Sequence, residues 1–243
     1  MFARNLRFGL LRGSEITFQR IHRVPTRGLS TNQPPKLDNP DYWTSFYQRK
    51  AGAPFDWFVD DAEVIQEIAE HVRSMTQPSS RSSVLHIGCG TSILSEALFR
   101  ETTLKLLLHT DIDETAVRQT QERLGGAALS GQGHRVEVDD ILNSKFCTHN
   151  FDVVVDKGVV DCFVHSGNDE ALKQALDNIK SALSPTGKLV MVTNDDYVMR
   201  EGDFIKLGLM RDWDVPRMKS VELVGEETGF ACNMFTISPR DKN

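Results

Sequence analysis

The sequence predicts an α/β fold in which seven strands form a doubly wound, mostly parallel sheet that ends in an antiparallel hairpin. Three observations support this prediction. Short apolar runs alternate with helical patterns from residue 37 onward, a glycine-rich turn follows the first clear strand, and the last two apolar runs are joined by a connection too short for a helix. A chain of 243 residues is long enough to bury one sizeable core.

The first strand and its turn carry the main chemical signal. Residues 84–87 are apolar enough for a short strand, and Gly88 and Gly90 follow directly. Without a Cβ, these glycines let the backbone turn tightly and come close to a ligand. Apolar residues at helical spacing in 92–100 predict a helix that begins just beyond the turn with free backbone N–H groups. A strand, glycine turn and helix of this kind predict a Rossmann-like sheet.

An acid at the end of the second strand narrows the choice of ligand. Asp111 lies 21 residues after Gly90, past the apolar stretch 104–108, and its carboxylate can accept hydrogen bonds from both hydroxyls of a ribose. Nicotinamide enzymes use the same turn and a similar acid. Here, however, Ile93 occupies the third fingerprint position, where a dinucleotide fold has Gly or Ala. The pattern therefore favours an adenosine-type ligand over a dinucleotide or a purely structural turn.

The remaining elements continue the alternation of strands and helices. The run 151–156 is almost wholly apolar, as expected of a central parallel strand that is covered on both faces. The other predicted elements are helices at 64–75, 114–124 and 169–183 and strands at 135–138 and 188–193.

The end of the chain departs from this rhythm. Residues 220–225 and 230–237 are predicted strands, and the few residues between them cannot form a crossover helix. The two strands must therefore pair antiparallel, as a hairpin at the sheet edge. Nothing in residues 37–243 indicates a domain boundary, so we expect one domain there.

Charge separates the first residues from this domain. Residues 1–36 hold seven basic residues and one acid, a net charge of +6, whereas the rest of the chain has a net charge of −12. An Arg-rich, acid-poor start with Leu and Phe at helical spacing is typical of a mitochondrial presequence. We expect residues 1–36 to be that presequence and the protein to act in the mitochondrial matrix, the alternative being an ordinary basic tail. The acidic body argues against binding to nucleic acid.

Composition excludes other classes. With 40% hydrophobic and 26% charged residues, the chain resembles soluble globular proteins. No apolar run approaches the roughly 18 residues of a membrane span, so we expect no membrane insertion. The four cysteines show no spacing of a zinc site, and no metal is expected. Cys89 in the glycine turn is interpreted as a small buried residue, and His86 in the first strand as a packed one.

The glycine turn, Asp111, Asp140 after the third strand, and the terminal hairpin together resemble the seven-strand S-adenosylmethionine-dependent methyltransferases. Within that class, the branch that methylates lysines of translation elongation factor 1-alpha and of mitochondrial citrate synthase is the most similar. The segments that carry this resemblance are Tyr-Trp-Thr-Ser-Phe-Tyr at 42–47, Pro-Phe-Asp-Trp-Phe at 54–58, Gly-Cys-Gly-Thr-Ser at 88–92 and Asp-Lys-Gly at 156–158. The resemblance runs from about residue 41 to the end.

The resemblance implies S-adenosylmethionine as cofactor and a set of residues that bind it. Aromatic side chains of the N-terminal segment would close over the cofactor, the glycines and a lysine would face its methionine end, and two acids with their following isoleucines would hold the ribose and adenine. Packing in the core is the alternative role for the two aromatic residues. The implied residues are Trp43, Tyr47, Gly88, Gly90, Asp111, Ile112, Asp140, Ile141 and Lys157.

The implied reaction is direct displacement by a neutral lysine amine, so a carboxylate near the target lysine would orient it or pass on its proton. Asp161 and Asp195, which both follow strand ends, are the candidates for this catalytic role. Asp156-Lys157-Gly158 is followed by Val159 and Val160, where similar proteins have Thr and then Trp or Leu, so the pocket wall is expected to differ there. Acids between Asp56 and Glu63 form a patch that could attract a basic protein face, although helix starts also favour acids.

Three interpretations of function remain open. With the basic leader, the resemblance implies a protein-lysine methyltransferase acting on citrate synthase, active as a monomer. The second is a methyltransferase acting on elongation factor 1-alpha, another mitochondrial protein or a small molecule. The third is a non-catalytic assembly factor that binds S-adenosylmethionine.

Overall fold

The computed structural model describes residues 35–50, 52–59, 61–76, 82–100, 104–125, 133–225 and 231–240. The predicted presequence lies outside the described residues up to residue 34, as do Asp60 and Phe230. The described residues belong to the unit that begins at Pro35.

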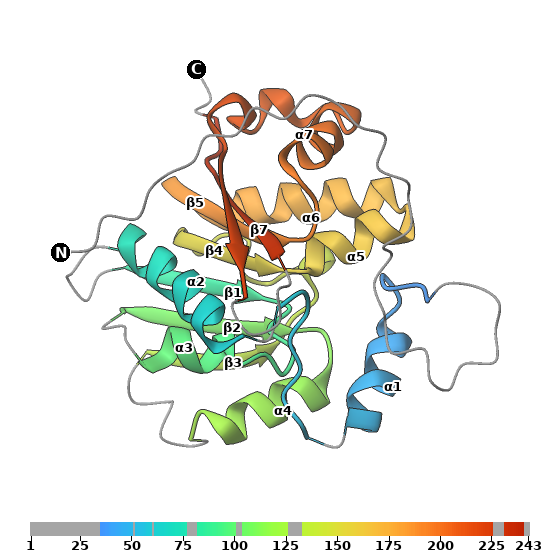
Figure 1. Cartoon of the computed structure of the whole chain (residues 1–243), viewed down its shortest axis with the longest axis vertical. Coiled ribbons are helices and arrows are strands. Elements are labelled where there is room, and N and C mark those ends of the chain that lie inside the picture. The colour runs from blue at the N-terminus through green and yellow to red at the C-terminus, as the bar shows by residue number, and fades with distance from the viewer. Residues whose placement is uncertain are drawn as a thin grey trace. The chain divides into compact units, whose positions relative to one another are not determined.

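A seven-stranded sheet in the order β3-β2-β1-β4-β5-β7-β6 forms the centre of this unit (Figure 1). Neighbouring strands from β3 to β5 pair in parallel, and β7 pairs antiparallel with both β5 and β6. The sheet confirms the predicted fold class, including the C-terminal hairpin. The strands are β1 (Ser83–Ile87), β2 (Leu106–Asp111), β3 (His134–Val138), β4 (Phe151–Lys157), β5 (Leu183–Thr193), β6 (Lys219–Val224) and β7 (Ala231–Ile237).

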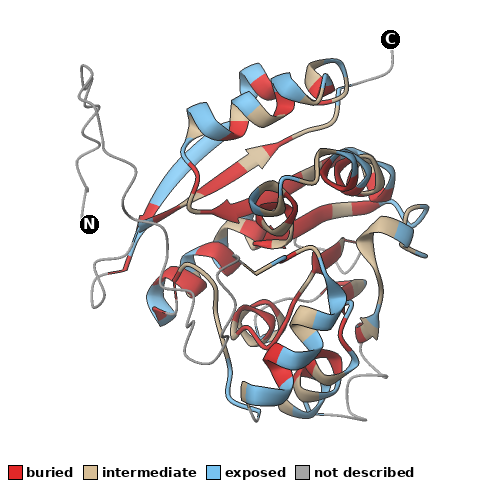
Figure 2. Ribbon diagram, turned by 90° about the vertical axis from the view of Figure 1, so that its right-hand side faces the viewer, coloured by how far each residue is buried: buried red, intermediate tan, exposed pale blue. Residues whose placement is uncertain are grey.

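Helices cover both faces of the sheet because the buried strands alternate their apolar side chains between the two. Leu85 and Val154 pack with α5 (Val159–Ser166) and α6 (Asp169–Ala182) in one cluster. Val84 and Val153, one residue away on each strand, pack with α2 (Ala62–Met75) and α3 (Leu94–Arg100) in another. Two cores therefore flank the sheet, and Figure 2 shows the strands at the centre as the most buried part of the molecule.

The remaining helices lie toward the ends of the strands. Phe46 and Tyr47 of α1 (Pro40–Lys50) pack against α4 (Glu114–Arg123), which follows β2. The helix α7 (Tyr197–Lys206) follows β5 and packs on the α5–α6 side. Three short 3₁₀ turns complete the described chain: η2 (Ile141–Asn143), η3 (Leu209–Arg211) and η4 (Val215–Arg217).

The structure differs from the prediction in β5, which begins at Leu183 rather than at residue 188. Phe151 pairs with Leu183 and Val153 already pairs with Lys188, so the extra residues form an irregularity in the strand. Gly187 is required there, because a Cβ would lie 2.7 Å from the carbonyl oxygen of Phe151. The Ser-Pro-Thr-Gly segment was predicted as a loop since its composition is typical of turns.

Three helices, α1, α5 and α7, were not predicted from apolar periodicity. The sequence of α5 starts with two valines, which are weak helix formers, and its helix is bounded by Gly158 and Gly167, both with positive φ. Asp196 caps the start of α7 by accepting from the backbone N–H of Met199 at 2.9 Å.

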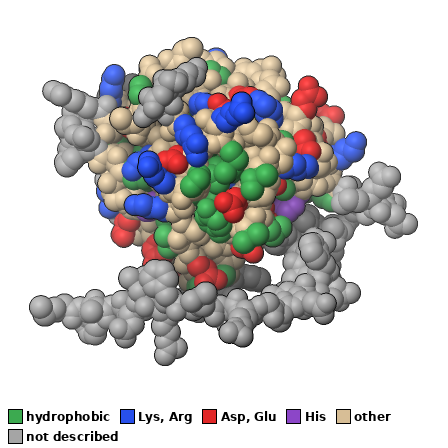
Figure 3. Space-filling view, turned by 90° about the horizontal axis from the view of Figure 1, so that it is seen from above, with side chains coloured by type: hydrophobic (Ala, Val, Ile, Leu, Met, Phe, Trp, Pro, Cys, Tyr) green, Lys and Arg blue, Asp and Glu red, His purple; other side chains and the backbone are tan. Residues whose placement is uncertain are grey.

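The hairpin strand β6 and the helix α7 form the exposed outer parts of this end of the molecule. In β6 only Leu223 is buried, and α7 exposes Val198, Met199 and Ile205. Figure 3 views the molecule from the side that carries α7 and shows hydrophobic side chains gathered there among basic ones. Within the described residues, no helix has the length and apolar character that crossing a membrane requires.

Candidate cofactor site

A pocket of about 890 Å³, counted to its open mouth, lies at the carboxyl ends of β1, β2 and β4. Ligands of open α/β sheets bind at this edge, where the strand order reverses between β1 and β4. The N-terminal segment from Leu37 to Trp57 contributes the opposite wall. Every residue predicted to bind the cofactor lines this pocket: Trp43, Tyr47, Gly88, Gly90, Asp111, Ile112, Asp140, Ile141 and Lys157.

The glycine turn leaves room that any other residue would fill. Gly88 and Gly90 have φ values of +53° and +52°, which L side chains rarely adopt. A Cβ on Gly88 would lie 2.0 Å from Cγ2 of Val159, and a Cβ on Gly90 would lie 2.6 Å from the hydroxyl of Tyr47. The turn is therefore held between α5 and α1, and its backbone forms part of the pocket surface.

Asp111 supports this turn. One carboxylate oxygen accepts from the N–H of Gly90 at 2.8 Å and the other from the N–H of Asp113 at 2.9 Å. Burial raises the pKa of Asp111 to about 6, and the backbone N–H donors of Asp113, Gly90 and Ile112 oppose this shift. A carboxylate has about four acceptor positions, so it can still accept from a ribose hydroxyl. The residue fits the predicted role, and it also shapes the turn, which the sequence did not indicate.

An apolar slot follows on the β2–β3 side of the pocket. Ile112 and Ile141 line it, and Asp140 caps the 3₁₀ turn η2 by accepting from the N–H of Leu142 at 2.9 Å. Asp139 also lines this side. The residues predicted to hold adenine thus line the same pocket, and their contact with adenine stays a prediction.

The aromatic residues of α1 both pack in a core and line the pocket. Tyr47 is buried beside Phe46 and Ala116, and its ring centroid lies 6.0 Å from that of Trp43. The indole N–H of Trp43 donates to the carbonyl of Leu37 at 2.7 Å. Both aromatic residues thus pack in a core and line the pocket, while their closing over the cofactor stays a prediction. The helix is anchored to the domain by the Thr44 hydroxyl, which donates to Asp113 at 2.7 Å.

Lys157 is tied to the N-terminal segment by a buried ion pair that the sequence did not reveal. Its ammonium lies 2.9 Å from a carboxylate oxygen of Asp56, and both side chains are 3% exposed. It also donates to the carbonyl of Trp57 at 3.0 Å. The second oxygen of Asp56 accepts from the N–H of Ile93 at 3.0 Å, and the Ser92 hydroxyl donates to the first. The carboxylate thus joins three segments that are distant in the sequence.

This finding corrects the interpretation of the acidic patch. The side chain of Asp56 is 3% exposed, and Asp61 is buried at the start of α2, where its side chain accepts from the N–H of Glu63 at 3.0 Å. Both carboxylates hold the local structure and cannot form an exposed attraction surface, so the alternative role as helix-start acids is correct for Asp61.

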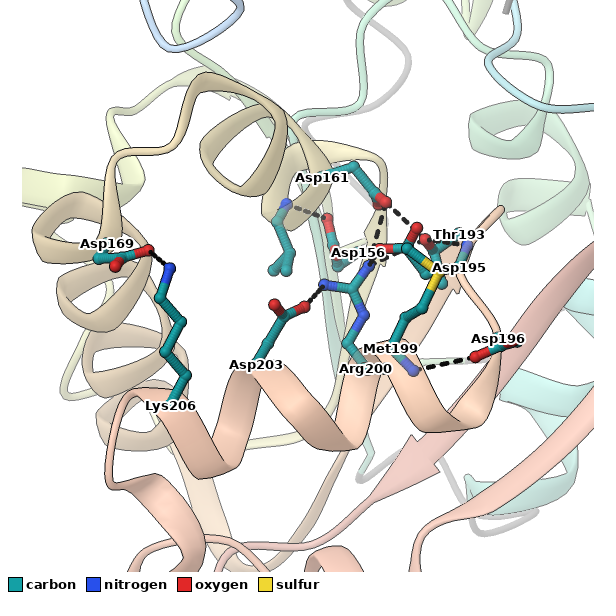
Figure 4. A network of polar contacts seen from close by, with 11 residues as sticks. Asp156, Asp161, Asp169, Thr193, Asp195, Asp196, Met199, Arg200, Asp203 and Lys206 are labelled. Atoms are coloured by element: carbon teal, nitrogen blue, oxygen red, sulfur yellow. Dashed lines mark hydrogen bonds and ion pairs between the residues drawn. The ribbon is translucent and has the colours of Figure 1, made fainter. Parts of the chain in front are cut away.

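Asp161 and Asp195, the predicted catalytic residues, meet around Arg200 of α7 (Figure 4). Its guanidinium lies 3.0 Å from Asp161 and 2.9 Å from Asp195, and it donates to the Thr193 hydroxyl at 2.9 Å. The arginine side chain is 1% exposed. Neither acid is among the residues that line the pocket. Both acids therefore hold α7 in place through Arg200, while their catalytic role stays a prediction.

The first turn of α5 connects this cluster to the pocket. Asp156 at the end of β4 accepts from the N–H groups of Val159 and Val160 at 2.8 and 3.3 Å, and burial raises its pKa to about 7. Val159 and Cys162 face the pocket while Asp161, on the same helix, contacts Arg200. A change in the ion cluster would thus reach the pocket wall through one helical turn.

Comparison with known proteins agrees with this geometry. A family model described as a methyltransferase domain matches residues 85–189. The mouse eEF1A lysine and N-terminal methyltransferase is 28% identical over 153 residues, 63% of this chain and 20% of that protein. Protein-lysine N-methyltransferase efm4 of Schizosaccharomyces pombe is 26% identical over 204 residues, 74% of this chain and 85% of that protein. The chain thus spans about a fifth of the first relatives and most of the length of the latter.

A solved structure shows the same fold. The N-methyltransferase NodS from Bradyrhizobium japonicum WM9, in complex with S-adenosyl-L-homocysteine, has a TM-score of 0.60 at 20% identity, covering 82% of this chain and 99% of that one. Strand order and the matched domain make the chain similar to the class I S-adenosylmethionine-dependent methyltransferases. The chain is also similar to the protein-lysine methyltransferases named above.

Proposed function

We propose that this protein transfers methyl groups from S-adenosylmethionine to a lysine of another protein. The observation that carries the proposal is the single pocket that gathers the glycine turn, Asp111, Lys157 and the aromatic N-terminal segment at the sheet edge. The names of the relatives support lysine as the acceptor, because they include lysine methyltransferases from mammals and a fission yeast.

Bound S-adenosylmethionine would supply a methyl group on a sulfonium, which is already a good leaving group. The protein then has to orient the reactants and to present a neutral amine. A free lysine has a pKa of about 10.4 and is mostly charged at neutral pH. Removal of the amine from water on entry into the pocket would disfavour that charge by desolvation.

Asp161 is the less completely paired of the two proposed proton acceptors. One of its oxygens accepts from Arg200, whereas the other is buried with no hydrogen-bond partner among the described residues. Burial also raises the pKa of this carboxyl. A carboxylate with one free oxygen and a raised pKa can take a proton more readily than one that is fully paired. Asp195 accepts from Arg200 and is the second candidate.

The proposed substrate is citrate synthase in the mitochondrial matrix, which rests on the net charge of +6 in residues 1–36 and on the motifs at 42–47, 54–58 and 156–158. A specific observation favours a second candidate, elongation factor 1-alpha, since the mouse and bovine relatives carry that factor in their names.

The test is methyl transfer from labelled S-adenosylmethionine to purified citrate synthase and to purified elongation factor 1-alpha in parallel, with the protein lacking residues 1–36. We expect label on a lysine of citrate synthase and none with Asp111→Ala. Asp177→Ala, on the exposed outer side of α6, is the matched control and should keep activity. Label only on elongation factor would select the second candidate. Cofactor binding without transfer to either protein, or to a mitochondrial extract, would favour the non-catalytic interpretation.

The proposed location has its own test. A fluorescent fusion of the full chain should enter mitochondria, and a fusion lacking residues 1–36 should remain in the cytosol. Neutralising the arginines within residues 1–36 should have the same effect as the deletion, because presequences depend on their positive charge. Mitochondrial entry of the truncated fusion would contradict the prediction.

A further inference from the structure

Two buried histidines lie side by side below the glycine turn, and no role above uses them. His86 of β1 and His109 of β2 are register partners in the parallel sheet. They are 1% and 0% exposed, and their ring centroids are 5.4 Å apart. His86 is also one of the residues that line the pocket, whereas His109 is not.

The two rings share one hydrogen bond. Nδ1 of His86 lies 3.1 Å from Nδ1 of His109, so one of these nitrogens donates and the other accepts. Burial lowers the pKa of His86 to about 3, with Lys157 adding to the shift, and the pKa of His109 also lies well below its ordinary value. Both rings are therefore neutral, and each carries a single N–H.

The surroundings favour one of the two possible arrangements. The hydroxyl of Ser95 approaches the same Nδ1 of His86 at 3.5 Å, so two donors converge on it when it accepts. In this arrangement Nε2 of His109, which is buried and has no partner among the described residues, carries no hydrogen. In the opposite arrangement that nitrogen would bear a buried N–H without an acceptor. Orphaned buried N–H groups are the rarer defect in native proteins.

It follows that Nε2 of His86 carries the proton and is a neutral donor at the pocket. His86 points to the same face of the sheet as Lys157, since His86 pairs with Val155 and Lys157 lies two residues further along β4. The charge of Lys157 is already compensated by Asp56 at 2.9 Å. This part of the pocket therefore needs a partner that accepts hydrogen bonds.

We propose that Nε2–H of His86 donates to the carboxylate of the methionine portion of S-adenosylmethionine, and that His109 is a positioning residue that keeps His86 in this tautomer. The inference rests on the proposed function. Of the two polar groups at the methionine end, the ammonium only donates and the carboxylate only accepts, so the carboxylate alone matches a donor. Lys157, beside His86, has a third N–H to add to the same group.

The test compares two ligands that differ in the amino-acid part: S-adenosylhomocysteine and methylthioadenosine, which lacks both the carboxylate and the ammonium. Binding to the full chain is measured by titration calorimetry for His86→Phe and His86→Gln, whose carboxamide can restore a donor. We expect His86→Phe to weaken S-adenosylhomocysteine binding at least tenfold, as for a lost hydrogen bond to a charged group, and to leave methylthioadenosine within about twofold. His86→Gln should recover part of the loss.

His109 supplies the second arm. His109→Asn keeps a donor near the place of Nδ1 and should bind S-adenosylhomocysteine almost as the unchanged protein does, whereas His109→Leu should lose affinity for this ligand only. A nitrogen-15 NMR spectrum, with the His86 signals assigned through the His86→Gln variant, should show Nε2 protonated and Nδ1 not.

The outcomes separate the inference from the proposed function. Equal losses for both ligands would mean that the histidines act only in packing and would overturn the inference, as would protonation of Nδ1. Strong binding of S-adenosylhomocysteine by His86→Phe would overturn the inference and leave the proposed function intact. A wild-type chain that binds neither ligand would overturn both.

Discussion

Gly88 is held in a conformation and a space that exclude every other residue. We predict that Gly88→Ala destabilises the fold by more than the cost of left-handed backbone alone, about 1–2 kcal/mol, because its Cβ would overlap Val159. Gly167→Ala is the matched control: φ is +66° there, and a Cβ would meet nothing within 4 Å. Urea unfolding measures both. Equal losses of unfolding free energy would show that the turn has room for a Cβ.

Asp111 should make cofactor binding depend on pH. In the proposed site, ribose hydroxyls would donate to the ionised carboxylate, and burial raises its pKa in the free protein to about 6. Affinity is therefore fully present above pH 7 and is lost as the pH falls through 6, by about tenfold at pH 5. Titration with S-adenosylhomocysteine from pH 8 to 5 measures this.

The control for this pH profile is Asp111→Asn. It should bind weakly at every pH, since an amide cannot accept from both sides and does not titrate. His86 and His109 do not contribute in this range, because burial keeps their pKa values well below it. An affinity of the unchanged protein that does not vary with pH would contradict a contact between Asp111 and the ligand.

At the scale of elements, the ion pair between Asp56 and Lys157 joins the N-terminal segment to β4. Removing one partner leaves a buried charge, so Asp56→Asn or Lys157→Met should each cost about 3–5 kcal/mol, and the double variant should cost clearly less than their sum. The exposed pair Lys173–Asp177 is the control cycle and should show little coupling. Hydrogen exchange of residues 52–59 should rise in Asp56→Asn. Additive losses and unchanged exchange would contradict this role.

Arg200 joins α7 to the rest of the domain through its buried ion pairs with Asp161 and Asp195. We expect Arg200→Met to cost about 3–5 kcal/mol, because Asp161 and Asp195 would both lose their buried counter-charge. Arg217→Met removes an arginine that is 85% exposed and paired with Asp214, and should cost less than about 1 kcal/mol. Thermal unfolding compares the two. A fully folded Arg200→Met protein without methyl transfer would instead support a catalytic role for the cluster.

For the whole molecule, the sequence patterns predicted the sheet and a set of residues that line one pocket, but not the contacts that position them. Apolar periodicity and the glycine turn predicted the strands and the hairpin, since both depend on local patterns. The link between Asp56 and Lys157 joins residues 101 positions apart, and Arg200 meets Asp161 across 39. Such pairs follow from tertiary packing, which leaves no periodic signal, so Asp56 was placed wrongly on the surface.

The roles of single residues could be predicted only in part, because a local pattern identifies a residue but not its long-range contacts. Asp111 was recognised by its distance from Gly90, and the structure adds that its oxygens hold Gly90 and Asp113. His86 was correctly interpreted as a packed histidine. Its hydrogen bond with His109 could not be predicted, because it forms only when β1 and β2 pair. The sequence thus indicates which residues matter where the pattern is local, and the sheet decides what they touch.

The central claim is that the pocket at the ends of β1, β2 and β4 binds the cofactor through Asp111 and the glycine turn. The most direct measurement is calorimetric titration of the full chain with S-adenosylhomocysteine. The account predicts one site per chain, abolished in Asp111→Ala and unchanged in Asp177→Ala, whose carboxylate is exposed on α6. No binding by the unchanged chain, or equal binding by the two variants, would contradict it.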